Sequence, residues 1–199
     1  TDVLGAVLEV IEGEPLGAIL QRRVFGPLGM HDTGFSVPAA QQHRLAEPFA
    51  LDPQTGLKVA LIDVTAPPVF ESAGGGLVST ARDYARFLQL MLGRGTAPGP
   101  HGPVRLLGRA TVDFMTADHL GSLPVAGDIL PTGHGFGLGV AVRTAAGLAT
   151  RPGSAGQYSW SGLGGTFFFV DPVEDLFAIL LTQAPGQLRY LCELYPALV

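Results

Sequence analysis

The sequence predicts an α+β fold in which helices pack around an antiparallel sheet. Three apolar runs of strand length lie close together towards the C-terminus, at residues 158–162, 166–170 and 176–182. Asp171 and Pro172 begin a segment, 171–175, with the residue types of a turn between the last two runs. Apolar residues recur at helical spacing in residues 1–11 and again in 79–93. Because the runs are apolar on both faces, we expect the sheet to be covered on both sides.

The N-terminal part of the chain is expected to form two helices. Residues 1–11 place Val3, Leu4, Val7, Val10 and Ile11 on one face, and Gly13 ends the helix. Pro15 suits the first turn of a second helix, which Gly26-Pro27 should end. Asp32-Thr33-Gly34 then has the composition of a turn.

The middle of the chain is expected to carry one long helix among turns and loops. Ser79 is its expected N-cap, Asp83 lies in the favoured first turn, and Gly93 ends the helix. The other expected features are a hairpin with strands at 46–51 and 57–62, a loop at 95–103, a short helix at 109–115 and an irregular, mobile segment at 118–132.

The C-terminal part is expected to complete the sheet. A strand is predicted over residues 136–143, ahead of the three apolar runs. A short helix is predicted over 187–195, and we expect it to cover one face of the sheet.

The composition allows a substantial core and excludes several classes of partner. Apolar residues make up 47% of the 199 positions. The net charge of −5, without a cluster of lysine or arginine, argues against nucleic acid. No apolar run reaches the roughly 20 residues that a membrane-spanning helix needs. Cys192 is the only cysteine, so an internal disulfide is excluded, and a cytoplasmic protein is compatible with this count.

The sequence contains no complete catalytic or cofactor-binding set. None of the serines is followed by a lysine three places on, and Lys58 is the only lysine. The five histidines show no metal-ligand spacing, so no metal is expected. Gly74-Gly75-Gly76 lacks the lysine of a phosphate-binding loop, so no nucleotide cofactor is expected either.

Three stretches in series resemble a known family. They are Val3-Leu4-Gly5 through Pro27-Leu28-Gly29-Met30 to Phe35, then Ala73-Gly74-Gly75-Gly76-Leu77 to Phe87, then Trp160-Ser161-Gly162 to Pro172. In this order and spacing they resemble the serine β-lactamase-like superfamily, and most closely the family VIII carboxylesterases, which are related to class C β-lactamases. The resemblance covers nearly the whole chain.

The resemblance implies an antiparallel sheet flanked by helices, with a mainly helical and irregular middle region. On this basis residues 1–30 form the helical start, 31–135 the inserted middle region, and 136–199 the C-terminal strands and helix. The family's nucleophilic serine lies in S-x-x-K and its base in a tyrosine motif. Neither motif is in this chain. The resemblance therefore implies the C-terminal portion of a domain that is incomplete at its N-terminus, with a segment before Thr1 as its partner.

The family's third motif does map onto this chain. Trp160-Ser161-Gly162 aligns with K-T-G and resembles the W-x-G form of the esterase branch, which makes these residues the expected substrate-binding wall. The backbone N–H of Leu163 would then be one oxyanion donor. A lysine at this place would hold a carboxylate, whereas an indole offers apolar surface and one N–H. The resemblance thus favours neutral, short acyl esters over β-lactams as small-molecule substrates.

Other interpretations stay open at this point. The same fold supports β-lactam hydrolysis, cleavage of D-amino peptides, amide hydrolysis and acyl transfer. A binding module without catalytic activity would also explain the missing S-x-x-K. Trp160 would then be an ordinary core aromatic, and the glycines beside it ordinary turn residues.

Overall fold

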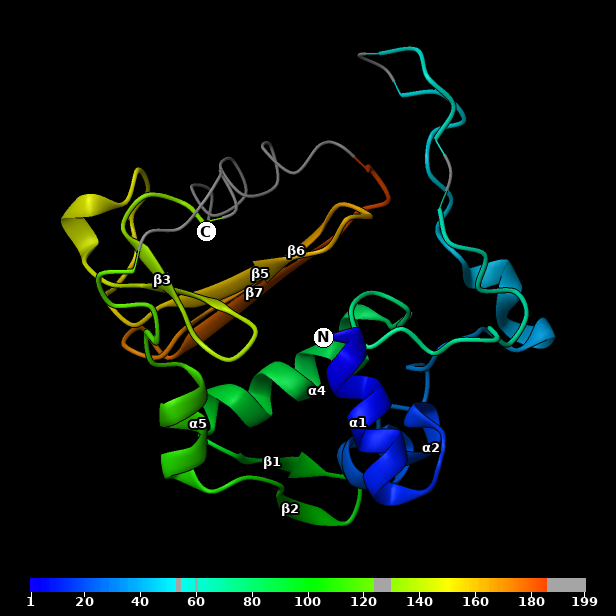
Figure 1. Ribbon diagram of the computed structural model, residues 1–199, viewed down its shortest axis with the longest axis horizontal. Helices are drawn as coiled ribbons and strands as arrows, with labels where there is room; N and C mark the ends of the chain where they lie inside the picture. The colour runs from blue at the N-terminus through cyan, green and yellow to red at the C-terminus, as the bar shows by residue number, and fades with distance from the viewer. Residues whose placement is uncertain (53–54, 60, 124–129, 186–199) are drawn as a thin grey trace.

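An antiparallel sheet organises the C-terminal half of the molecule (Figure 1). The computed structural model describes residues 1–52, 55–59, 61–123 and 130–185. Within these ranges the sheet has five strands in the order β3-β4-β5-β6-β7, with every neighbouring pair antiparallel. The strands are β3 (His134–Phe136), β4 (Ala141–Arg143), β5 (Tyr158–Ser161), β6 (Thr166–Asp171) and β7 (Leu176–Leu181). The three strands predicted from the apolar runs are therefore confirmed.

The single strand predicted over residues 136–143 is wrong, because the chain reverses within it. β3 and β4 form a hairpin in which Phe136 pairs with Ala141. The Gly137 N–H donates to the Val140 carbonyl over 2.8 Å and closes the turn. Gly139 has a φ of 97°, which side-chain-bearing residues rarely adopt. The glycines that looked compatible with a strand therefore make the reversal possible.

Both faces of the sheet are buried, as the apolar runs predicted. One face packs against helix α4 through Leu88, Met91, Tyr158 and Val170. On the other face Phe167 and Phe169 are 5% and 4% exposed. The helix predicted at 187–195, and Cys192 within it, lie outside the described residues.

The described residues form helices mainly at the start and middle of the chain. They are α1 (Asp2–Glu12), α2 (Leu16–Leu20), α3 (Gly26–Leu28), α4 (Ala81–Leu92) and α5 (Arg109–Met115), with a π-helical turn at Gln21–Phe25 and 3₁₀ turns at Ala39–Arg44 and Ala146–Leu148. The second predicted helix runs further than expected. Pro27 lies in α3 directly after the π-helical turn, and the helical path ends at Gly29, which adopts a left-handed φ of 70°.

Two predictions about hairpins need correction. The loop predicted at 95–103 contains a strand, because β1 (Thr96–Gly99) pairs with β2 (Gly102–Arg105). The chain does reverse across residues 52–56 as predicted, with an antiparallel bridge between Leu51 and Lys58 and a 2.8 Å bond from the Asp52 N–H to the Leu57 carbonyl. However, the described residues of 46–51 and 57–62 do not form strands. We call the described residues of 46–62 the arm, which extends away from the body of the molecule (Figure 1).

Helix α4 begins one residue later than predicted. Thr80, rather than Ser79, is the N-cap, and its Oγ1 accepts a hydrogen bond of 3.2 Å from the Asp83 N–H. The Ser79 hydroxyl lies 2.8 Å from that of Thr33 instead. Both residues carry the hydroxyl that a cap requires, so the sequence alone does not separate them.

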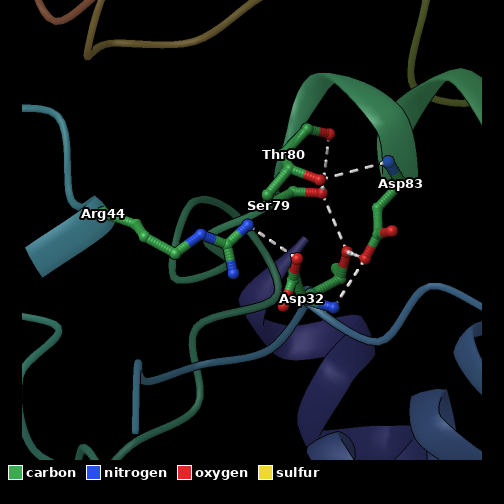
Figure 2. Close-up of polar contacts among 6 residues, drawn as sticks. Asp32, Arg44, Ser79, Thr80 and Asp83 are labelled. Atoms are coloured by element: carbon green, nitrogen blue, oxygen red, sulfur yellow. Dashed lines mark hydrogen bonds and ion pairs between the residues drawn. The ribbon is translucent and has the colours of Figure 1, made fainter. Parts of the chain in front are cut away.

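A polar cluster joins the start of α4 to the turn at residues 32–34 (Figure 2). The Asp83 carboxylate is buried and accepts hydrogen bonds from the Asp32 N–H at 2.7 Å and the Thr33 hydroxyl at 3.0 Å. Arg44 donates to the Asp32 carboxylate at 2.8 Å, and this bond lowers the pKa of Asp32. The cluster thus fixes the base of the arm to the body of the molecule.

Candidate active site

The end of strand β5 has an open edge beside Trp160 and Ser161. On one side β5 pairs with β6, with Trp160 opposite Phe168. On the other side β4 pairs only with Tyr158 and Ser159. The Gly162 N–H donates to the Thr166 carbonyl over 2.9 Å, so even-numbered residues bond towards β6. By this alternation the N–H and C=O of Ser161 point to the side where β4 has already ended.

The predicted oxyanion donor, Leu163, lies at the tip of the β5–β6 hairpin. Its residue surface is 88% exposed. The turn is closed by a 3.0 Å hydrogen bond from the Gly165 N–H to the Gly162 carbonyl. The Leu163 N–H thus has no hydrogen-bond partner among the described residues.

Trp160 is half-buried and lies outside the sheet's hydrophobic core cluster. Its indole contacts the Phe136 ring edge to face, with ring centroids 5.1 Å apart and planes at 68°. Phe136 comes from β3, which is separated from β5 by β4. Sequence reasoning missed Phe136 as a neighbour of the site. The signal available was an aromatic residue between two glycines, Gly135-Phe136-Gly137.

The N-terminus of α1 is tied to the glycine-rich segment 72–76. The Asp2 carboxylate accepts hydrogen bonds from the Ser72 hydroxyl at 2.9 Å and the Gly74 N–H at 2.8 Å. These two bonds, Ser72 first, lower the pKa of Asp2. The structure therefore brings the first two of the three matched stretches into contact, and Figure 1 shows the start of α1 close to the start of α4.

The described residues do not themselves assemble a nucleophile with a base. The Ser72 and Ser79 hydroxyls are engaged with Asp2 and Thr33, respectively. Lys58 lies on the arm, beside Leu51. In the same described part of the chain, no group of three or more histidine, cysteine, aspartate or glutamate side chains is placed to hold a metal ion. No described helix is long and apolar enough to cross a membrane.

Comparison with known proteins identifies the family. A family model described as Beta-lactamase matches residues 1–198. The chain belongs to this Beta-lactamase family. Protein Rv1367c of Mycobacterium tuberculosis is 40% identical over 191 residues, covering 92% of this chain and 47% of that protein. Esterase EstB of Burkholderia gladioli is 31% identical, again over 92% of this chain and 47% of the relative.

Solved structures agree with the observed mixture of helices and antiparallel strands. EstCE1, described as a hydrolase with promiscuous acyltransferase activity, superposes with a TM-score of 0.69 at 26% identity, covering 94% of this chain and 51% of EstCE1. Simvastatin synthase LovD of Aspergillus terreus also gives 0.69, at 19% identity, covering 98% and 52%, and supports the fold alone. This chain thus spans about half the length of the proteins it matches. The resemblance to β-lactamase-like proteins and the α+β fold class are confirmed.

Proposed function

We propose that this chain is the C-terminal portion of a serine hydrolase, a carboxylesterase that hydrolyses short acyl esters through an acyl-serine intermediate. The observation that supports this proposal most is the end of β5. There an indole, an open strand edge and an available N–H at Leu163 adjoin one another. The 31% identity with an esterase over 92% of the chain adds to this support.

Each group at the end of β5 has a distinct part in the proposed reaction. The Leu163 N–H would stabilise the oxyanion that forms when a serine attacks the ester carbonyl. The N–H and C=O of Ser161 would hold polar atoms of the substrate along the strand edge. Gly162 lies between them without a side chain, so a substrate can lie close to the backbone.

Three catalytic residues are proposed to lie in polypeptide before Thr1: the nucleophilic serine, the lysine that activates it and the tyrosine base. A serine hydroxyl is a weak nucleophile until a neighbouring group removes its proton. The relatives are about twice as long as this chain, which leaves room for these motifs. The 199-residue chain alone is accordingly proposed to be inactive.

A substrate panel on the full-length gene product tests the reaction class. We expect turnover of p-nitrophenyl acetate and butyrate, and little or none of the β-lactam nitrocefin. The 199-residue chain should turn over neither. Turnover by the chain alone would contradict the assignment of the nucleophile. Preferential hydrolysis of nitrocefin or of D-alanyl peptides would show that the protein is a β-lactamase or a peptidase and not an esterase. The absence of turnover with every substrate would favour a binding module.

The indole at position 160 is proposed to select against anionic substrates. Trp160→Lys should raise kcat/KM for an ester that carries a carboxylate, relative to its neutral analogue, by about tenfold, because an ion pair replaces an apolar contact. Trp160→Phe is the matched control, since it keeps an uncharged aromatic wall. If the ratio of kcat/KM for the anionic over the neutral ester is unchanged in the lysine variant, Trp160 does not contact the substrate.

Acyl transfer is a second candidate because of one specific neighbour. EstCE1, at 26% identity, is described as having promiscuous acyltransferase activity. Adding an alcohol to the ester assay distinguishes the two reactions. Formation of the new ester in competition with hydrolysis would support transfer, and release of free acid alone would exclude it.

A further inference from the structure

We propose that Asp118 is a positioning residue that holds the Trp160 indole in place through Phe136. This inference deepens the proposed function, because the consequence for substrate selectivity rests on it. The contacts themselves do not depend on which reaction the protein catalyses.

Asp118 fixes the backbone of Phe136 from outside the sheet. Its Oδ1 accepts a hydrogen bond of 3.1 Å from the Phe136 N–H. The next residue, His119, donates its N–H to the Phe136 carbonyl over 2.9 Å. The N–H and C=O of Phe136 are therefore both hydrogen-bonded to residues 118–119. These bonds fix the backbone at the last residue of the short strand β3.

The Asp118 carboxylate is itself held in position. It also accepts hydrogen bonds from the Leu120 N–H at 2.9 Å and the Gly121 N–H at 3.2 Å. These donors, Leu120 first, lower the pKa of Asp118. The carboxylate is therefore a fixed acceptor at a turn and not a freely rotating surface group.

The two glycines that flank Phe136 allow this close approach. A Cβ at Gly135 would overlap the Asp118 carboxylate, and a Cβ at Gly137 would overlap the Met115 carbonyl. The Leu138 N–H donates to that carbonyl over 2.8 Å. Segment 115–118 thus lies directly against the backbone of β3 at Gly135 and Gly137. Phe136, between these two glycines, carries the only side chain of the three residues.

Phe136 connects the fixed segment to the candidate site, because its ring contacts Trp160. Its ring meets the indole edge to face at 5.1 Å, a favourable geometry for two aromatic rings. Strand β4 does not pair with β5 at Trp160, so no backbone hydrogen bond to β4 fixes this residue. A fixed Phe136 would therefore restrict the orientations of the indole at the proposed acyl site.

The orientation of Trp160 is measured directly in the full-length gene product by ¹⁹F NMR after labelling with 5-fluorotryptophan. Trp160→Phe identifies the resonance by removing it. Phe136→Leu should shift this resonance by more than its line width, since the adjacent ring is lost. Asp118→Ala and the milder Asp118→Asn should broaden it or split it into more than one signal. Asp113→Asn is the matched control, because Asp113 lies on α5 and its carboxylate pairs with Arg94, which follows the end of α4, rather than with the backbone of β3.

Several outcomes would overturn the proposal. An unmoved resonance in Phe136→Leu would show that the rings are not in contact. A normal resonance in both Asp118 variants, or one that Asp113→Asn disturbs equally, would show that Asp118 does not position the indole. If Asp118→Ala fails to fold, Asp118→Asn decides the question, because it keeps the size of the side chain but replaces one of the two accepting oxygens by an NH₂ group that cannot accept from a backbone N–H.

A kinetic readout connects the position of the indole with selectivity. In an active esterase, Asp118→Asn should lower the ratio of kcat/KM for butyrate over acetate by about threefold to tenfold, with a smaller change for acetate alone. An unchanged ratio would contradict the link to selectivity. If no ester is hydrolysed but the ¹⁹F result holds, the proposed function fails and the positioning role of Asp118 stands.

Discussion

The β5–β6 hairpin and the arm both reverse the chain, but only β5–β6 forms a ladder of paired strands. β5 and β6 pair from Tyr158 to Ser161, and Phe169 in β6 is 4% exposed. The described part of the arm shows the bridge between Leu51 and Lys58, and Phe49 is 72% exposed. The difference shows that a hairpin sequence with apolar residues forms a stable pair of strands only where a helix or further strands bury those residues.

The largest expected effect contrasts one phenylalanine from each segment. Phe169→Ala should lower the free energy of unfolding by about 3–5 kcal/mol, because a large buried side chain is lost. Phe49→Ala should change it by about 0.5 kcal/mol or less, because the ring is mostly in water. Denaturant unfolding of the full-length gene product measures both. Equal losses would mean that the arm is buried against another part of the protein.

A smaller contrast uses one glutamine at the base of each segment. Gln157 Oε1 accepts a 3.1 Å bond from buried Arg143, and its Nε2 lies 3.4 Å from buried Asp171. Gln157→Leu should cost about 1–3 kcal/mol, since a buried charge loses an acceptor.

The matched control is Gln42→Leu beside the arm. Gln42 donates from a half-buried position to the Val37 and Thr65 carbonyls. Its loss should cost about 1 kcal/mol or less, because water can replace the amide there. Chemical denaturation of both variants tests the order, and a larger loss at Gln42 would reverse the comparison.

The buried hairpin also contains a group that should oppose stability. Tyr158 is 2% exposed, and its hydroxyl has no hydrogen-bond partner among the described residues. Burial raises the pKa of Tyr158. Tyr158→Phe should therefore leave the free energy of unfolding unchanged or raise it by up to about 1 kcal/mol. A clear loss in a thermal melt would show that the hydroxyl has a partner.

The smallest expected effect concerns the attachment of the arm. The hydrogen bond from Arg44 lowers the pKa of Asp32. Stabilisation from this pair is present above the unfolded pKa and is lost as pH falls through the lower folded pKa, so only acid below about pH 4 should weaken it. Arg44→Gln should move the NMR-detected titration of Asp32 upwards. An unmoved titration would show that Arg44 does not contribute in solution.

The sequence predicted the features that depend on neighbouring residues. Gly13, the turn at 171–175 and the apolar runs act locally, and the structure confirms the elements they define. The reversal at Gly139 was missed because its flanking residues alternate like a strand. The contact between Phe136 and Trp160 was missed because it crosses an intervening strand, so it depends on strand order and register, which no local pattern contains.

The open edge at the end of β5 carries a consequence for how this polypeptide associates. Within the described residues β4 pairs with β5 only at Tyr158 and Ser159, so the N–H and C=O of Ser161 have no strand beside them. Unpaired backbone groups of this kind can pair with an extended segment of a second molecule. The 199-residue chain should therefore self-associate as its concentration rises, and an extended ligand that pairs with Ser161 would suppress that association.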